Sequence, residues 1–473
     1  MRCLAYLFLL FDLLASCIPP PSSRPTVDHP NIILILADDA GYADFGFMGS
    51  EDLETPRIDE LAEDGVIFTD AHVSASVCAP SRAGLITGKY QHRFGHECND
   101  IPLDNGLDLQ EKTIASALKT KGYQTMVVGK WHLGLGEAYH PNQRGFDEFY
   151  GFLAGARSYF PSEKEDQPGH PRAILENQIH RTFDGYLTDV LGDKSVDFID
   201  RNKETPFFLF LSFNAVHTPM HAKEEHLEKY KDHPRQKLAA MTWSMDENIG
   251  KVMDKLKQEG IYDKTLIFFL SDNGGASNNQ ASNLPLKGWK GNKYEGGHRV
   301  PFTVTWKDQF EGGVSYDGLT SSLDIMATAI RAAGIEAGIS WGLDGTDLLP
   351  VLKGERKIEP HFDLYWRKDK MAAARSGEYK LIRLDDYGYR LYNVEADLSE
   401  TVDVQSSLPN QFTQLKSNLE KWENEMQAPR WLEVEVWNEV TYEIHQALME
   451  NRDPKYTNPS EMRVYREGEF GQN

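Results

Sequence analysis

Residues 31–39 read NIILILADD, a continuous apolar run that ends in two neighbouring carboxylates. An apolar run without polar alternation predicts a strand buried on both faces, as in a parallel sheet that helices cover. Three later runs have the same character: Thr125–Val128, Phe207–Phe213 and Thr265–Leu270. Helical patterns lie between the runs, at Thr55–Glu63, Thr113–Lys121, Tyr186–Asp200 and Gln236–Gln258. The alternation of strand and helix predicts an α/β sandwich.

The pattern changes after Gly345, where continuous apolar runs give way to short alternating ones. Tyr379–Arg383 and Arg390–Val394 predict strands of that kind, and Leu408–Met426 predicts an amphipathic helix. We therefore expect a main domain at residues 29–345. Residues 346–473 are expected to form a smaller α+β subdomain with an antiparallel sheet and a polar tail.

Composition excludes several classes of protein. The 473 residues include 50 Lys plus Arg and 72 Asp plus Glu, a formal charge of −22, and no run of basic residues. A nucleic-acid binder needs a basic face, so we expect no nucleic-acid partner. The 40% hydrophobic and 11% aromatic content is that of a globular chain. Four cysteines in so long a chain cannot form a disulfide scaffold.

The N-terminus has the pattern of a targeting segment. Arg2 precedes an apolar stretch, Leu4–Leu14, that is shorter than the roughly 20 residues of a membrane span but suits a signal peptide. Residues 14–17, LASC, resemble the bacterial lipobox, in which the cysteine is acylated. We expect residues 1–17 to be a lipoprotein signal region with Cys17 lipidated, and residues 18–28 to be a Pro/Ser tether. Ordinary secretion with cleavage near Ala15 is the alternative. Either way the protein is expected to be exported, and the lipoprotein would sit in the bacterial cell envelope, in the periplasm or on the outer-membrane face, with the membrane as a partner through its lipid.

Polar side chains follow each of the apolar runs. In open parallel sheets, ligands bind beyond the carboxyl ends of the strands, so we expect these side chains to meet at one edge. They are Asp38, Asp39, Lys130, His132, His217, Asp272 and Asn273. Singly, each has a structural explanation: a helix cap, a turn, or a satisfied core histidine. Together, the carboxylates and the amide offer the hard oxygen ligands that suit Ca²⁺ or Mg²⁺.

Residues 78–88, CAPSRAGLITG, are the most informative segment. Pro80 suits the first turn of a helix, so Cys78 should lie at a helix N-terminus, where the dipole favours negative charge. A loop cysteine beside a helix start and an ordinary thiolate nucleophile are two interpretations that remain open.

With this segment the chain resembles the type I sulfatases of the alkaline-phosphatase-like superfamily, because the motif C-x-P-S-R-x-x-x-x-T-G is complete. The likeness covers about Pro30 to Pro301 and continues into the C-terminal part. The other matching segments are residues 38–42, 129–134, 145–147, 215–219, 271–275, Lys290 before 295–297, 377–382 and 391–394. The resemblance implies a large mixed, mostly parallel sheet between helices, with a small C-terminal antiparallel sheet. His298 departs from the family, which more often has a small apolar residue there.

The resemblance also implies a role for each matching residue. A maturation enzyme would oxidise Cys78 to formylglycine (3-oxoalanine), whose hydrate attacks sulfur, and Arg82 would stabilise that hydrate. Lys130 and Lys290 would hold sulfate oxygens, His217 would protonate the leaving alkoxide, and His132 would take the proton from the second hydroxyl. One Ca²⁺ would be held by the acidic and amide residues, Asp38, Asp39, Asp272 and Asn273.

The substrate is expected to be a sulfated carbohydrate. Residues 145–153, GFDEFYGFL, resemble those of bacterial sulfatases that act on polysaccharides. We therefore favour oligosaccharides of a marine algal polysaccharide such as ulvan or carrageenan, with a glycosaminoglycan also open. Loops carry specificity on such scaffolds, so residues 151–181 are expected to read the substrate. The expected substrate-binding residues are Arg157, Ser158, His96 and His298, and Arg93 and Lys293 should add positive charge near the pocket.

Two alternatives come from other classes. One is a phosphoesterase or phosphonate hydrolase of the same superfamily, some members of which also use formylglycine. The other is a catalytically silent lipoprotein that only binds sulfated glycans, although that interpretation expects lost catalytic residues and every matched position is intact. Cys98 is the one cysteine without an expected role.

Overall fold

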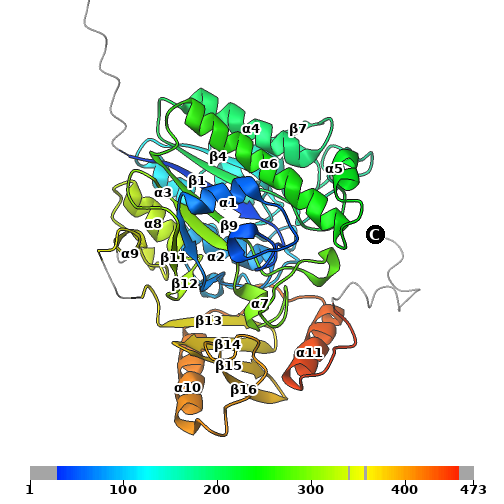
Figure 1. The fold of residues 1–473 in the computed structure, drawn as a ribbon, viewed down its shortest axis with the longest axis vertical. Coiled ribbons are helices and arrows are strands. Elements are labelled where there is room, and N and C mark those ends of the chain that lie inside the picture. Colours follow the sequence, from blue (N-terminus) through cyan, green and yellow to red (C-terminus); the bar gives the residue numbers. More distant parts are fainter. Residues whose placement is uncertain (1–28, 339–340, 356–358, 458–473) are drawn as a thin grey trace, which may run out of the picture.

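A computed structural model describes residues 29–338, 341–355 and 359–457, and Figure 1 shows its fold. The predicted signal region, Cys17 and the tether lie outside the described residues. Among the helices of the described ranges, none combines the length and the apolar character that crossing a membrane requires.

The large unit is built on a ten-stranded mixed sheet in the order β11-β2-β10-β9-β1-β8-β4-β5-β6-β7. Its central strands, from β9 to β5, run parallel, and antiparallel pairs flank them at both sides. The strands are β1 Asn31–Ala37, β2 Val66–Phe68, β4 Gln124–Lys130, β5 Glu148–Phe152, β6 Ile174–Glu176, β7 Ile179–Arg181, β8 Phe207–Ser212, β9 Thr265–Ser271, β10 Phe302–Thr305 and β11 Val314–Tyr316. The four predicted strands are confirmed as the neighbours β9, β1, β8 and β4.

Helices cover both faces of this sheet, and the side chains of β1 divide between them. Ile33 and Ile35 belong to one core, together with α1 Pro56–Glu63, α4 Leu187–Asn202 and α6 Gln236–Gln258. Ile32, Leu34 and Leu36 belong to the other core, together with α2 Cys78–Thr87, α3 Ile114–Lys119 and α8 Asp324–Ala332. Burial on both faces explains why the run is continuously apolar. The four predicted helices are confirmed as α1, α3, α4 and α6.

The short elements complete the large unit. They are a two-stranded sheet of β3 Ala71–His72 and β12 Thr320–Ser321, and the helices α5 Glu224–Lys229, α7 Glu295–His298 and α9 Leu349–Leu352. Leu348, Leu349 and Leu352 pack in the same core as α2. The boundary expected at residue 345 is therefore too early, because the chain still buries apolar side chains in the large unit beyond that point.

The small unit lies below the large one in Figure 1 and contains a four-stranded antiparallel sheet in the order β13-β14-β15-β16. Its elements are β13 Asp363–Lys368, β14 Met371–Ser376, β15 Tyr379–Leu384, β16 Gly388–Asn393, α10 Pro409–Glu425 and α11 Glu435–Met449. The predicted β15, β16 and α10 are confirmed. Strand β14 was not predicted because its alanine-rich sequence lacks alternation, and α11 was not predicted because it follows an irregular polar stretch.

The carboxyl end of β4 illustrates how tightly the strand ends pack. Gly129 has a φ of 112°, and a Cβ atom there would lie 1.9 Å from the Ser212 carbonyl oxygen. Only glycine fits such a position. The backbones of β4 and β8 can therefore approach each other closely at Gly129. Lys130 is the next residue and the last of β4, so its side chain lies at the edge of the sheet.

Candidate active site

Cys78 is the first residue of α2, and its side chain is almost fully buried, with 1% exposed. Its Sγ lies 3.7 Å from Asp38 Oδ1 and 3.9 Å from Asp39 Oδ1. Burial raises the pKa of the Cys78 thiol to about 12, although Lys130 and Lys290 act in the opposite direction. The unmodified side chain is therefore a neutral thiol, and this disfavours the ordinary thiolate nucleophile.

The four predicted oxygen ligands converge beside Cys78. Asp38 and Asp39 follow β1, and the Asp39 backbone N–H donates to Asp272 Oδ1 at 3.2 Å. Asn273 Nδ2 donates to Asp39 Oδ1 at 2.8 Å, whereas Asn273 Oδ1 has no hydrogen-bond partner. A buried amide oxygen without a donor is costly, and it is the group that a hard cation would bind. The donor set of three carboxylates and one amide oxygen therefore fits Ca²⁺.

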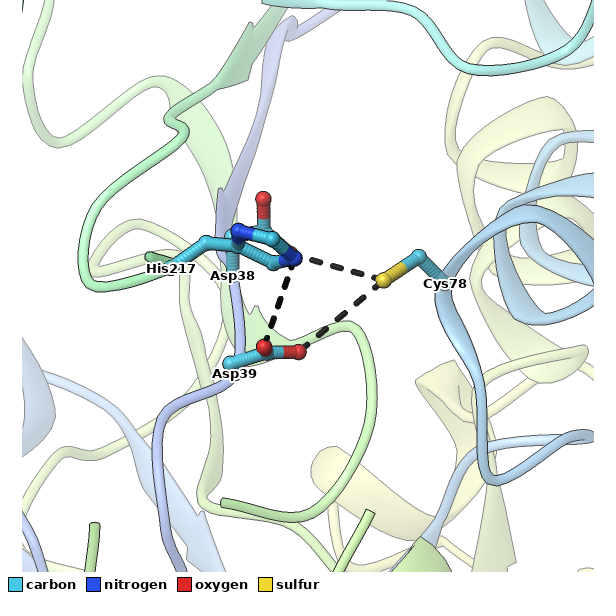
Figure 2. A group of neighbouring side chains, drawn as sticks. All are labelled: Asp38, Asp39, Cys78 and His217. Carbon is cyan, nitrogen blue, oxygen red and sulfur yellow. Dashed lines mark hydrogen bonds and ion pairs between the residues drawn. The ribbon is translucent and has the colours of Figure 1, made fainter. Parts of the chain in front are cut away.

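Figure 2 shows Asp38, Asp39, Cys78 and His217 facing one another at this edge, and one ligand atom from each lies within 4.8 Å of the others. Burial raises the pKa of Asp38 to about 7 despite the nearby Lys130. Burial alone would also raise the pKa of Asp39, but Lys290 and His217 hold it below its ordinary value. The two adjacent carboxylates are thus held in unlike environments.

Three basic side chains pair with the three carboxylates. Lys130 Nζ donates to Asp38 Oδ2 at 2.6 Å, and Lys290 Nζ lies 2.7 Å from Asp39 Oδ1. Arg82 Nε donates to Asp272 Oδ2 at 2.8 Å. Because Lys130 and Arg82 are buried, these charges sit in a medium where electrostatic interactions are stronger than in water. Each carboxylate of the site thus has one basic partner, and a cation bound by the carboxylates would leave these basic groups in excess beside an anionic group.

His217 follows β8 and is held as a neutral ring. Its Nδ1 donates to the Thr218 carbonyl oxygen at 2.6 Å, which directs Nε2 toward Asp39 Oδ2 at 3.6 Å. Burial, with smaller effects of Lys290 and Lys130, lowers the pKa of His217 to about 3, although Asp39 acts in the opposite direction. An anion beside Nε2 would raise this pKa, so binding of an anionic substrate favours the protonated, acidic form.

His132 lies near the same basic cluster, with a left-handed backbone at φ 57°. Burial, and secondarily Lys130 and Arg82, hold the pKa of His132 well below its usual range. Its Nδ1 has no hydrogen-bond partner. A Cβ at Gly155 would lie 2.6 Å from this ring, so a glycine is needed for the ring to occupy that place. The result is a neutral imidazole that can accept a proton.

Two residues that sequence reasoning did not assign hold the loops of the site together. Asn279 Nδ2 donates at 3.0 Å to the carbonyl oxygens of both Asp39 and Val216. The Tyr159 hydroxyl donates to the His217 carbonyl oxygen at 2.8 Å. Asn279 ends the short 3₁₀ helix Ser277–Asn279, and no spacing in this polar stretch of the sequence singles it out. Tyr159 was expected only as part of the polar loop.

A pocket of about 400 Å³ opens from this cluster. Its floor includes Asp39, His217 and Lys290, and its walls come from both units of the protein. The walls include Asn99, Arg172, Asn278, Trp289, Lys368, Glu433 and Trp437. Within the polar loop at residues 151–181 it is therefore Arg172 that lines the pocket.

The structure corrects several expected substrate contacts. The Arg157 guanidinium is buried and bonded to the carbonyl oxygens of Ser158 and Arg172 and to Asp166 Oδ1. His96 is buried with its ring 4.7 Å from the Trp431 ring centroid, and His298 is buried with its ring stacked at 3.9 Å on Trp366. None of the three can reach a substrate from such a position.

The remaining expected contacts have other partners. Ser158 is partly exposed, and its Oγ lies 3.3 Å from His221 Nδ1. Arg93 forms an ion pair with Asp344 at 2.7 Å, and the buried Lys293 donates to Ser76 Oγ at 3.1 Å. The prediction that Arg93 and Lys293 add positive charge near the pocket is therefore wrong. The charge of Arg93 is neutralised by Asp344, and Lys293 is buried.

The family model and the similar proteins of known sequence are all sulfatases. The model of the Sulfatase family matches residues 30–335, more than half of the chain. The mouse N-acetylgalactosamine-6-sulfatase is 32% identical over 400 residues, which cover 78% of this chain and 73% of that protein. A sulfatase of Escherichia coli K12, YdeN, is 31% identical over 73% of this chain and 70% of its own length.

Solved structures agree in fold. The crystal structure of Ps i-CgsB in complex with k-i-k-neocarrahexaose has a TM-score of 0.82 and 37% identity, covering 88% of this chain and 98% of that chain. The phosphonate monoester hydrolase of Agrobacterium radiobacter has a TM-score of 0.62 at 19% identity, over 84% of this chain and 95% of that chain, which shows a shared fold alone. The predicted alkaline-phosphatase-like sandwich is confirmed.

Proposed function

The chain belongs to the sulfatase family and is a sulfatase, and we propose that its substrate is a sulfated carbohydrate that enters the pocket above Cys78. One observation carries the proposal. Cys78, Asp38, Asp39 and the neutral His217 form one cluster beside buried cations, and Asp39 and His217 of this cluster line a single pocket. Such an arrangement can bind an anionic sulfate ester, attack its sulfur and protonate the leaving oxygen.

The walls of the pocket and one similar structure support the substrate class. Trp289 and Trp437 offer apolar faces, and Asn99 and Asn278 offer amides, which is the mixture typical of small-molecule sites. Ps i-CgsB, 37% identical to this chain, binds a carrageenan-type hexasaccharide. We therefore propose an oligosaccharide of a sulfated polysaccharide, with carrageenan the favoured kind.

Two groups that the family implies fit the residues present. A formylglycine made from Cys78 would supply a hydrate hydroxyl as the nucleophile, and the neutral, buried thiol at a helix N-terminus is consistent with that need. A Ca²⁺ held by Asp38, Asp39, Asp272 and Asn273 would act as a Lewis acid toward the sulfate oxygens. The unpaired Asn273 Oδ1 supports this ligand set.

The chain's own residues would then hold the sulfate group and transfer the protons. Lys130 and Lys290 hold the sulfate and balance its charge, an electrostatic task in a water-poor site. Arg82, fixed by Asp272, keeps positive charge beside residue 78. His217 Nε2 carries a proton to the leaving alkoxide once the bound anion has raised its pKa, and the neutral imidazole of His132, beside the same basic cluster, accepts a proton.

The test uses protein produced together with a formylglycine-generating enzyme. We expect sulfate release from carrageenan-type oligosaccharides and from an aryl sulfate, and an aldehyde at residue 78 that a hydrazide reagent labels. Cys78→Ala should abolish both signals. Turnover of an aryl phosphate that exceeds that of the aryl sulfate would instead favour the phosphoesterase alternative. A protein with an unmodified Cys78 and bound glycan but no sulfate release would favour the silent binding protein.

We also propose that the protein is exported and anchored by a lipid at Cys17. The proposal rests on the signal-peptide pattern and the lipobox-like residues 14–17, which lie outside the described residues.

A further inference from the structure

One cation of the pocket lies outside the catalytic cluster and is accessible to solvent. It is Arg172, near the end of the β5–β6 loop, residues 153–173. Its side chain is 47% exposed, whereas those of Lys290 and His217 at the floor are 19% and 18% exposed. Lys368, the other lining cation outside the cluster among the described residues, is buried. Arg172 therefore lies nearer the mouth of the pocket than the floor residues do.

The Arg172 guanidinium has one carboxylate partner and keeps most of its donors free. Its Nη1 donates to Glu165 Oε1 at 2.8 Å, and Nε and Nη2 donate to none of the described residues. Arg93, by contrast, donates from both Nε and Nη2 to the two oxygens of Asp344 and does not line the pocket. Because a guanidinium carries five N–H donors in a planar fork, the remaining donors of Arg172 are available to a ligand.

Hydrogen bonds within the β5–β6 loop hold Arg172 in place. The buried Arg157 donates from Nη1 to the Arg172 carbonyl oxygen at 2.7 Å, and from Nη2 and Nε to Asp166 Oδ1 and the Ser158 carbonyl oxygen, each at 2.9 Å. Glu165 is fixed in turn, because the Ser158 backbone N–H donates to its Oε2 at 2.7 Å. A side chain that is held in this way before binding loses less conformational entropy when a ligand arrives.

The same loop is joined to both histidines of the candidate site. The carbonyl oxygen of its first residue, Leu153, accepts a hydrogen bond from the His132 backbone N–H at 3.1 Å. The Tyr159 hydroxyl donates to the His217 carbonyl oxygen at 2.8 Å. The loop that carries Arg172 is therefore anchored to the catalytic cluster, so the guanidinium keeps a set place relative to the group that reacts at the floor.

We propose that Arg172 is a specificity-determining residue that binds a second sulfate of the substrate, carried by the sugar next to the one that reacts. A guanidinium can donate two parallel hydrogen bonds to two oxygens of an oxyanion. The place of Arg172 near the mouth of the pocket suits a group that lies beyond the reacting ring. The inference rests on the proposed function, because it presumes a carbohydrate in the pocket, and it narrows the substrate class to oligosaccharides with sulfates on adjacent sugars.

The experiment compares two carrageenan-type oligosaccharides that differ only by a sulfate on the sugar next to the reacting one. For the wild-type enzyme, matured at residue 78, we expect kcat/KM to favour the doubly sulfated substrate about fivefold, or by about 1 kcal/mol, the upper value for exposed ion pairs. Arg172→Gln removes the charge and should bring this ratio toward one. Because the readout is a ratio, a general loss of activity in the variant does not affect it. Added salt screens exposed charges, so it should reduce the wild-type preference.

Arg181→Gln is the matched control. Arg181 is 44% exposed and pairs with Glu176 at 2.8 Å, much as Arg172 pairs with its own carboxylate, but it does not line the pocket. Its loss should leave the ratio as in the wild type, and an equal fall in both variants would assign the preference to general surface charge and overturn the inference. Equal turnover of both substrates by the wild type overturns it too, as does an unchanged ratio in Arg172→Gln. If neither oligosaccharide reacts while an aryl sulfate does, the carbohydrate proposal itself fails and takes this inference with it.

Discussion

The state of Cys78 before maturation leads to a quantitative prediction. Burial raises the pKa of its thiol from 9.0 to about 12, so the thiolate fraction at pH 8 is about one thousandth of that of an ordinary cysteine thiol. Alkylation requires the thiolate. We therefore expect Cys78 of the folded, unmatured protein to react with iodoacetamide at least about 1,000-fold more slowly than in the denatured chain.

The assay is time-resolved alkylation at pH 8, read by mass spectrometry of the peptide that contains residue 78. The protein is produced in a host without the maturation enzyme, and guanidinium-denatured protein gives the reference rate. Charge-removing variants separate electrostatics from access. Asp38→Asn removes a carboxylate that raises the thiol pKa, so it should speed the reaction, whereas Lys130→Met removes a cation that lowers the pKa and should slow it.

A rate within tenfold of the denatured reference would refute the reasoning. It would mean that Cys78 is a reactive thiolate in the folded protein, and the interpretation as an ordinary cysteine nucleophile would then stand. Identical rates in Asp38→Asn and Lys130→Met would show that access alone, and not the charges of the site, controls the thiol.

Four further predictions concern other parts of the chain. His217→Ala should lower kcat about 10²–10⁴-fold with an unchanged melting temperature, and a smaller loss would exclude it as the general acid. Asn279→Ala leaves two buried carbonyl oxygens without donors, so chemical denaturation should show a loss of about 2 kcal/mol or more. In EGTA, the free energy of unfolding should fall as pH rises from about 4 to about 7, because the raised pKa of Asp38 makes the folded state hold its proton more tightly than the unfolded chain. Asp38→Asn should reduce that slope without abolishing it, because burial also raises the pKa of Asp246 and of Glu400 to about 7. A slope that does not change at all would assign it to those other groups. Cys17→Ala should move the protein from the membrane fraction to the soluble fraction of its native host.

The central sheet could be predicted because each of its strands carries its own signal. Ile32 to Leu36 are apolar at every position since both faces of β1 are covered, and such a run is recognisable without knowing its neighbours. Strand β14 could not be predicted, because its burial depends on contacts with other parts of the small unit and a sequence of alanines does not record which partner will cover it. Helix α11 does carry an amphipathic signal, since the buried Val440, Ile444 and Leu448 recur every four residues, and it was missed.

The expected substrate contacts failed for a similar reason. His96, Arg157 and His298 are polar residues close in sequence to matched motifs, but sequence proximity does not tell whether a side chain faces a pocket or a packed interior. Arg157 forms its hydrogen bonds within its own loop, and His298 stacks on Trp366 of the small unit. A residue far along the chain, Glu433, lines the pocket instead.

The sequence by itself determined the α/β architecture, the family, and the residues that follow the strands, because strand burial and the motif around Cys78 are local patterns. Only the tertiary structure decided what surrounds them. Pairing between carboxylates and cations, the unpaired Asn273 Oδ1 and the raised pKa of the Cys78 thiol all arise from atoms that meet across hundreds of residues. The pocket wall that includes Glu433 and Lys368 likewise arises from residues that are far from Cys78 in the sequence. Electrostatic and desolvation effects depend on distance and burial in space, and a linear sequence specifies neither.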